Sequence, residues 1–144
     1  MSITIRPPKP AEMEAYYQLR HDVLRKPWGQ VKGTERSEDD ETAYHAAAFS
    51  AAGNLIGVGR LHLNSATEGQ VRFMAVAAET QGLGVGNFIM EHLEDHARTL
   101  GATKMILHAR QNAVPFYEKL GYHITAKSYL LFDEIQHWEM AKRL

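Results

Sequence analysis

Three glycines alternate at the junction between an apolar run and a helix-like run. Gly82, Gly84 and Gly86 stand in the stretch RFMAVAAETQGLGVGNFIMEHLEDHA, which begins at Arg72 and ends at Ala97. A helix N-terminus presents free backbone N–H groups and the positive end of the helix dipole, so such a turn favours an anion. Without Cβ atoms, a bulky diphosphate can touch the backbone. The alternative is a purely structural turn between a strand and a helix.

The two familiar nucleotide-binding motifs do not fit these glycines. A dinucleotide fingerprint, G-x-G-x-x-G, requires a third glycine where the sequence has Asn87 or Ile89. A P-loop requires Gly-Lys-Ser/Thr, and no such triplet follows. An anion site at these glycines would therefore belong to neither of these two classes of nucleotide-binding motif.

Composition narrows the class of protein. The net charge is -1 with neutral histidines, which argues against nucleic-acid binding because that usually needs a basic face. The absence of cysteine excludes thiol catalysis, a disulfide scaffold and cysteine zinc sites, and fits a reducing compartment. No apolar run approaches the roughly 18 residues of a membrane span, and MSITIRPPKP lacks the apolar core of a signal peptide. We therefore expect a cytoplasmic protein without nucleic-acid or membrane partners.

The elements that position the glycines follow from hydrophobic periodicity. The pattern predicts strands over 2–6, 44–50, 55–63, 70–77, 104–109, 122–126 and 136–142, and helices over 11–25, 84–100 and 114–120. Residues 30–42 form a loop with one helical turn, and 127–135 stay unassigned. The order β-α-β-β-β-α-β-α-β-β predicts one α+β domain over residues 1–144. Its mixed, mostly antiparallel central sheet is flanked by helices, with one parallel crossover through the helix at Gly84.

The segment MAVAAETQGLGVGNFIM resembles the acetyl-coenzyme A motif of the GNAT acyltransferase superfamily. That motif is an apolar strand followed by Gln/Arg-x-x-Gly-x-Gly/Ala, which opens a helix. Gln81, Gly84 and Gly86 occupy its defined positions, and Gly82 matches the glycine often found after the Gln/Arg. Ala78 departs from the pattern, because many members carry proline there.

A second stretch, NAVPFYEKLGY from Asn112 to Tyr122, resembles the other hallmark of this superfamily. That hallmark is, in loose form, Asn-x-x-Ala/Pro-x-x-Phe-Tyr-x-x-x-Gly-Phe/Tyr. The predicted element order is also that of the family fold, so the resemblance covers nearly the whole chain. Residues 108–140 are further similar to small bacterial GNAT proteins of unassigned substrate.

The resemblance implies acetyl-CoA as co-substrate and an N-acetyltransferase activity. Transfer to an amine needs a polarised thioester carbonyl, a neutral amine and a protonated leaving thiolate. The resemblance assigns the first task to the backbone N–H of Val76 and the third to the Tyr117 phenol as general acid. Each also has a structural alternative: an ordinary ladder N–H and a packed tyrosine. The implied coenzyme A contacts are Met74, Ala75, Val76, Gln81, Gly82, Leu83, Gly84, Val85, Gly86, Asn112, Phe116 and Tyr117.

Several questions stay open at this point. The general base is His108, His137, Glu139 or an ordered water, and Asn112 either contacts the cofactor or caps the helix that follows. The acceptor is a small-molecule or protein amine, whether the acyl group is strictly acetyl is undetermined, and a homodimer is one option for the oligomeric state. A non-catalytic acyl-CoA-binding sensor or scaffold is the alternative function, although the tyrosine favours an enzyme.

The other charged or potentially metal-ligating residues are explained by ordinary structural roles. His92 and His96 are four residues apart, but the stretch HLEDH lacks the glutamate that must follow the first histidine of the metalloprotease motif. We therefore expect no metal and a solvated helix edge. The acidic run from Glu38 to Glu41 is a solvated loop or attracts a cationic amine. Trp28 and Arg60 line the acceptor side or simply pack.

Overall fold

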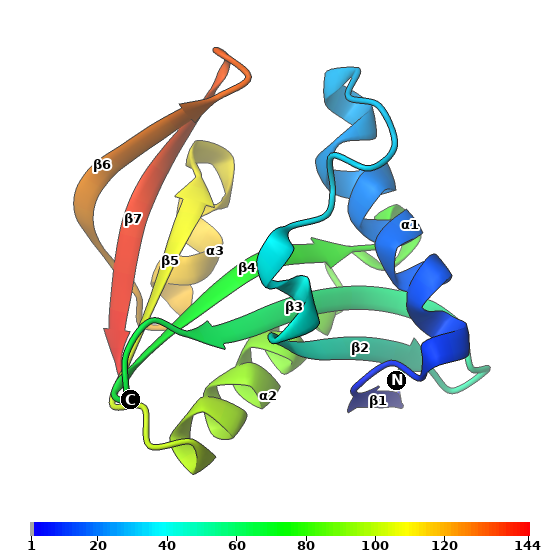
Figure 1. Ribbon diagram of the computed structural model, residues 1–144, viewed down its shortest axis with the longest axis horizontal. Coiled ribbons are helices and arrows are strands. Elements are labelled where there is room, and N and C mark those ends of the chain that lie inside the picture. The colour runs from blue at the N-terminus through cyan, green and yellow to red at the C-terminus, as the bar shows by residue number, and fades with distance from the viewer. Residues whose placement is uncertain (1) are drawn as a thin grey trace.

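A computed structural model describes residues 2–144, which form one seven-stranded sheet with helices on both faces (Figure 1). The strands are β1 (Ile3–Arg6), β2 (Tyr44–Ser50), β3 (Leu55–Leu63), β4 (Glu68–Val76), β5 (Lys104–Arg110), β6 (His123–Leu131) and β7 (Ile135–Arg143). The α-helices are α1 (Met13–Leu24), α2 (Val85–Thr99) and α3 (Val114–Lys119). Among these residues no helix combines the length and the hydropathy that a membrane span requires.

The sheet has the order β1-β2-β3-β4-β5-β7-β6. Every neighbouring pair is antiparallel except β4 and β5, which are parallel and joined by α2. The predicted α+β class, the element order and the single parallel crossover are therefore confirmed.

One predicted strand was too short. The sequence pattern ends the sixth strand at residue 126, whereas β6 continues to Leu131 through most of the unassigned segment. β6 is an edge strand whose side chains are mostly exposed, so it lacks the alternation of apolar and polar residues that marks a half-buried strand. Its partner β7 carries the buried side chains of the pair instead.

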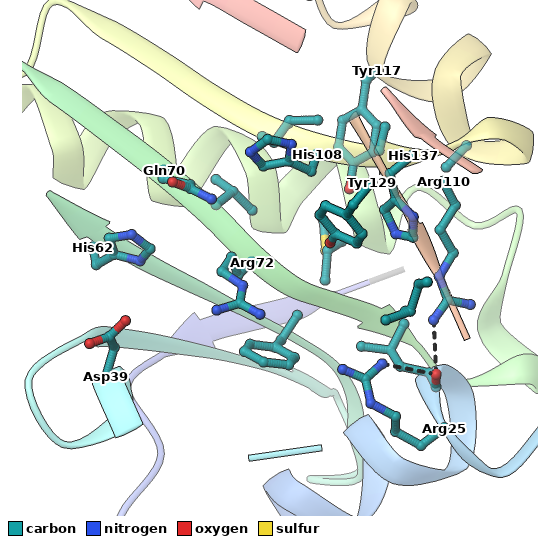
Figure 2. A pocket seen from close by; sticks show the side chains of 18 residues that line it. Arg25, Asp39, His62, Gln70, Arg72, His108, Arg110, Tyr117, Tyr129 and His137 are labelled. Atoms are coloured by element: carbon teal, nitrogen blue, oxygen red, sulfur yellow. Dashed lines mark hydrogen bonds between the residues drawn. The ribbon is translucent and has the colours of Figure 1, made fainter. Parts of the chain in front are cut away.

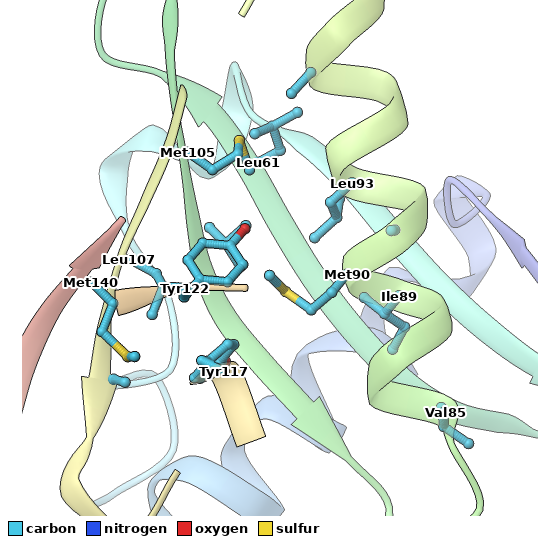
Figure 3. Close-up of a cluster of buried hydrophobic side chains, with 14 of the residues drawn as sticks. Leu61, Val85, Ile89, Met90, Leu93, Met105, Leu107, Tyr117, Tyr122 and Met140 are labelled. Carbon is cyan, nitrogen blue, oxygen red and sulfur yellow. The ribbon is translucent and has the colours of Figure 1, made fainter. Parts of the chain in front are cut away.

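The two faces of the sheet are covered by different helices. Ala47 and Phe49 of β2 pack with α1 on one face, while Ala46 and Ala48 belong to the core under α2 and α3 on the other. Successive strand residues point to opposite faces, so the run of small residues in β2 serves both cores. Figure 3 shows the second core, with α2 lying along the sheet.

Close packing of α2 depends on two glycines of β3. A Cβ at Gly57 would stand 2.7 Å from Ile89 Cδ1, and one at Gly59 would stand 2.8 Å from Ile89 Cγ2. Both distances are below ordinary contact, so larger residues would push the helix away. The helix N-terminus is thereby held beside the end of β4.

Candidate active site

The sheet opens between β4 and β5. The parallel pairing extends only from Glu68 opposite Lys104 to Val71 opposite Leu107, and the described strands show no pairing beyond it. Figure 1 shows the two strands diverging from this point. The separation leaves the last residues of β4 facing a gap instead of a neighbouring strand.

A bulge in β4 lies where this separation begins. Opposite β3, Arg60 pairs with Arg72 and Val58 pairs with Ala75, so β4 carries one extra residue between these pairs. Phe73 occupies the bulge with a φ of 55°, which is unusual for a residue with a side chain. The bulge turns the Phe73 ring to the α1 side, where the Arg20 guanidinium lies 4.2 Å from its centroid.

The bulge also sets which backbone groups of β4 face the gap. The N–H of Ala77 donates to the Ile56 carbonyl at 2.9 Å, on the β3 side. Because N–H groups alternate along a strand, the N–H of Val76 points to the opposite side, toward the gap. The Gln81 side chain donates to the Val76 carbonyl at 3.2 Å from that side. Val76 thus has the orientation that the predicted carbonyl donor needs.

A cavity of about 410 Å³ occupies the gap. It is lined by residues from the end of α1, from β4, β5, β6 and β7, and from α3 (Figure 2). Of the predicted residues, it brings together Met74, Tyr117, His108 and His137. Its polar lining residues are Arg25, Asp39, His62, Gln70, Arg72, His108, Arg110, Tyr117, Tyr129 and His137.

Tyr117 points from α3 into this cavity (Figure 2). Its side chain is buried, yet its hydroxyl makes no hydrogen bond to any residue between 2 and 144. Burial raises the pKa of the phenol, although the charge of Arg110 opposes the rise. The hydroxyl therefore keeps its proton at neutral pH and has a free donor directed at the gap.

The three side chains proposed as base differ in their surroundings. His137 Nδ1 lies 3.0 Å from the Ile135 carbonyl, which can only accept, so Nδ1 carries the proton and Nε2 keeps a lone pair. Burial lowers the pKa of His137 and holds the ring neutral. His108 is bound through Nδ1 to the Ser128 hydroxyl at 2.6 Å. Glu139 accepts from Thr125 and does not line the cavity.

The glycine turn lies outside the cavity lining, at the start of α2. Gly82 and Gly84 have φ values of 85° and 84°, and Gly84 is the N-cap residue of α2 rather than its first residue. Within residues 2–144, the N–H groups of Gly82, Gly84, Val85 and Gly86 donate no hydrogen bond. These four donors form an open cluster at the positive end of the helix dipole.

Two different structural requirements explain why glycine stands at positions 82, 84 and 86. Positive φ accounts for Gly82 and Gly84, where an added Cβ would meet no atom closer than 3.8 Å. Gly86 instead packs against α3, since its Cβ would stand 3.0 Å from Phe116 Cζ. Sequence reasoning explained the three glycines either by a diphosphate or by a purely structural turn, and packing against Phe116 is an additional structural reason for Gly86.

The pair formed by His92 and His96 packs against β2. His92 Nε2 lies 2.8 Å from the Tyr44 hydroxyl, and the His96 ring stacks on Tyr44 with centroids 3.6 Å apart. Among residues 2–144, no group of three or more His, Asp or Glu side chains is placed to hold a metal ion. The two histidines are half-buried, so the expected solvated edge is only partly correct.

One residue of the acidic run from Glu38 to Glu41 has a structural role. Asp40 is buried between Arg20 and Arg60, which approach its carboxylate at 3.0 Å each. Arg60 is itself fully buried, so it packs and does not reach the acceptor side. Of the run, only Asp39 lines the cavity. Trp28 is exposed and lies outside the lining.

Sequence reasoning missed six polar lining residues: Arg25, His62, Gln70, Arg72, Arg110 and Tyr129. They come from the residue after α1 and from β3, β4, β5 and β6, and no spacing in the sequence links them. Each is a common residue type that does not by itself indicate a functional site, so only the fold identifies these residues as a group.

The split sheet with its cavity and the open N–H cluster at the start of α2 are the features that the GNAT resemblance leads one to expect. Residues 22–144 match the family model described as an acetyltransferase (GNAT) domain. The chain therefore belongs to the GNAT acetyltransferase family and is an acetyl-CoA-dependent acyltransferase.

Individual relatives agree with this assignment. The chain is similar to the uncharacterized N-acetyltransferase YjcF of Bacillus subtilis, with 30% identity over 90% of each chain. A putative N-acetyltransferase from Lactobacillus plantarum superposes with a TM-score of 0.87, at 25% identity over 100% of this chain and 99% of the other. A GNAT family acetyltransferase from Elizabethkingia anophelis, solved with acetyl-CoA bound, has the same fold. Its TM-score is 0.77, at 16% identity over 99% of this chain and 98% of the other.

Proposed function

We propose that this chain transfers an acetyl group from acetyl-CoA to an amine by direct attack of the amine on the thioester. The observation that carries the proposal is the free Tyr117 hydroxyl, which points into the cavity where β4 and β5 separate. The Val76 N–H points away from β3 at the end of β4, on the side where the sheet opens, and this orientation supports its assignment as the donor for the carbonyl oxygen. Direct attack suits a chain that has no cysteine to form an acyl-enzyme.

In this mechanism the Val76 N–H donates to the thioester oxygen and stabilises the negative charge that develops on it. The amine nitrogen forms a bond to the carbonyl carbon, and the carbon–sulfur bond then breaks. Tyr117 donates its proton to the departing sulfur. Met74 lines the cavity on β4, whereas the side chain of Ala75 packs in the core under α1.

The cofactor diphosphate would bind the N–H cluster between Gln81 and Gly86. The open donors and the helix dipole support this placement, and Leu83 and Val85 belong to the same turn. Phe116 fixes the start of α2 against α3 and so links the turn to the helix that carries Tyr117. Asn112 is exposed in the turn before α3, and its side chain makes no hydrogen bond to residues 2–144 that would mark it as a cap.

The amine must lose a proton before or during attack. His137 is the side chain best suited to accept it, because its ring is held neutral with Nε2 free. His108 and an ordered water are the alternatives. The acceptor is a small-molecule or protein amine. Fold neighbours range from a ribosomal-protein-S18-alanine N-acetyltransferase to an aminoglycoside 6'-N-acetyltransferase.

The test is release of free thiol from acetyl-CoA in the presence of a broad panel of amines. Turnover with at least one amine, together with mass-spectrometric detection of the acetylated product, is the expected result. Calorimetry with coenzyme A is the parallel measurement. Binding of the cofactor without turnover on any amine would favour the sensor or scaffold instead, and absence of binding would contradict both functions.

A further inference from the structure

Three arginine side chains that line the cavity have no acidic partner. Arg25, Arg72 and Arg110 form no salt bridge with any residue between 2 and 144. The buried arginines nearby differ, since Arg20 and Arg60 share the carboxylate of Asp40. Cations that are half-buried without a counter-ion cost free energy, so their charge calls for an anion from outside the chain.

The three guanidinium groups are connected through shared contacts. Arg25 and Arg110 donate to the same Leu24 carbonyl, at 3.1 Å and 2.8 Å (Figure 2). Arg25 and Arg72 share the Phe73 ring, with their Cζ atoms 5.8 Å and 4.6 Å from its centroid. The bulge that turns this ring toward α1 therefore helps to bring the charges of Arg25 and Arg72 together.

The charges of the group are only weakly compensated. The Leu24 carbonyl, at the C-terminus of α1, supplies a partial negative charge. Asp39 is the one acidic residue in the lining within the described chain, and Figure 2 shows it beside His62. Burial lowers the pKa of all three arginines, and the neighbouring Arg110 and Arg72 lower the pKa of Arg25 further.

The cofactor diphosphate does not account for this group. Its proposed site is the N–H cluster from Gln81 to Gly86, and no residue of that turn lines the cavity. The arginines lie in the same cavity as Tyr117 and His137, where the acceptor must meet the thioester. An anion held by them would thus belong to the acceptor.

We propose that the acceptor is a small amine that also carries an oxyanion, a carboxylate or a phosphate, bound by Arg25, Arg72 and Arg110. Guanidinium groups match both oxyanions in geometry and charge. A cavity of about 410 Å³ suits a small molecule. The same positive charge disfavours diamines and other polycations. This inference rests on the proposed transferase function and adds the class of its substrate.

The experiment compares matched amines in the thiol-release assay. The twenty amino acids are tested against their amides, and phosphoethanolamine against ethanolamine. At neutral pH the amide has the less basic amine and is intrinsically more reactive, so a preference for the acid must come from the protein. We expect kcat/KM to favour at least one acid over its amide, or phosphoethanolamine over ethanolamine, by roughly 10–100-fold, as one or two charge-assisted hydrogen bonds supply. The pair that shows the preference distinguishes carboxylate from phosphate.

Variants connect the preference to the arginines. Arg72→Gln and Arg110→Gln should each shrink the acid-to-amide ratio by about tenfold or more, with the loss mainly in acceptor KM. Arg143→Gln is the matched control. It removes the same charge, but at an exposed position at the far end of β7. Affinity for coenzyme A, measured by calorimetry, should stay as in the parent.

Three results would overturn the inference. The first is a panel in which no anionic amine is preferred over its neutral partner. The second is a loss of coenzyme A affinity in Arg72→Gln with an unchanged acid-to-amide ratio, which would assign the arginines to the cofactor. If no amine turns over, the transferase proposal fails, and the inference about the arginines is then tested by calorimetry of the coenzyme A complex with the same acids and amides. The third contradicting result is that no acid binds this complex more tightly than its amide.

Discussion

The Tyr129 ring stacks on the imidazole of His137, with centroids 4.4 Å apart and planes 21° from parallel. Tyr129 lies on the exposed edge strand β6, and His137 lies on β7 in the cavity wall. The phenol ring thus covers one face of the imidazole. This contact contributes to the burial that lowers the pKa of His137, the candidate base.

Tyr129→Ala should therefore raise the pKa of His137 toward its ordinary value of 6.5. Burial disfavours the charged ring, so removing the cover makes protonation easier and the neutral, base-competent form is lost at a higher pH. An NMR titration of the imidazole Cε1 proton, assigned with His137→Gln, measures the change. Leu130→Ala on the same strand is the control, since Leu130 and Tyr129 are exposed to a similar extent. An unchanged titration of His137 in Tyr129→Ala would show that the stacking does not set its pKa.

Tyr117→Phe should leave the fold intact and reduce kcat by about 10²–10⁴-fold, the range typical of a general acid. Its hydroxyl bonds to no described residue, so its removal costs no hydrogen bond within the chain. The loss should shrink with an acyl donor whose thiol is more acidic, because that thiolate needs less protonation. Stopped-flow or steady-state thiol release measures it.

Tyr122→Phe is the matched control for this variant. Tyr122 packs near Tyr117, with ring centroids 6.0 Å apart, but its hydroxyl donates to the Glu94 carboxylate at 2.8 Å. Tyr122→Phe should therefore lose about 1.5–3 kcal/mol of unfolding free energy and keep kcat. Parent-like turnover in Tyr117→Phe would identify that tyrosine as a packing residue.

Asp40→Asn should destabilise the protein by about 3–5 kcal/mol, because it leaves Arg20 and Arg60 buried without a counter-charge. Burial raises the pKa of Asp40, but hydrogen bonds from Arg20, from the Ser37 N–H and from Arg60 outweigh it and hold the pKa below 3.8. The stabilisation is complete above that unfolded-state value and is lost as the pH falls through the lower folded one. Urea unfolding as a function of pH measures both effects.

The neighbouring Asp39→Asn provides the comparison. Asp39 is exposed and forms no salt bridge within residues 2–144, so its substitution should change the unfolding free energy by less than about 0.5 kcal/mol. A loss of similar size in both variants would mean that the acidic run acts through its total charge, not through the buried pair.

Features carried by adjacent residues could be predicted from the sequence. The turn from Gln81 to Gly86 and the helix that begins at its end are contiguous; the alternating glycines identified the turn and hydrophobic periodicity identified the helix. The family resemblance singled out Tyr117 as general acid, a role that stays a prediction, and the structure puts its side chain in the cavity. The split between β4 and β5, by contrast, has no local signal, because it depends on how many residues of the two strands pair.

The arginine group could not be predicted for a related reason. Arg25 follows α1, while Arg72 and Arg110 lie on strands that separate after Val71. Their proximity results from the bulge at Phe73 and from the end of α1 reaching across the gap, both tertiary effects. The length of β6 was missed because an exposed edge strand needs no alternating pattern, and Tyr129 was missed with it.

The last prediction concerns the glycine turn. Gly84→Val should lower affinity for coenzyme A by about tenfold or more, the equivalent of one lost charge-assisted hydrogen bond. Gly84 has a φ of 84°, which a β-branched residue adopts only with strain, so the open N–H groups at the start of α2 would be displaced. The added side chain would also occupy space beside the donors. Calorimetry with coenzyme A measures the change.

Backbone strain alone must be separated from this effect. Gly53 has a φ of 86°, lies exposed in the turn between β2 and β3, and has no atom within 4 Å of its would-be Cβ. Gly53→Val therefore introduces similar strain, about 1–2 kcal/mol, far from the N–H cluster. Both variants should lose comparable unfolding free energy, and only Gly84→Val should lose coenzyme A affinity. Parent-like affinity in a folded Gly84→Val variant would remove the diphosphate from this turn.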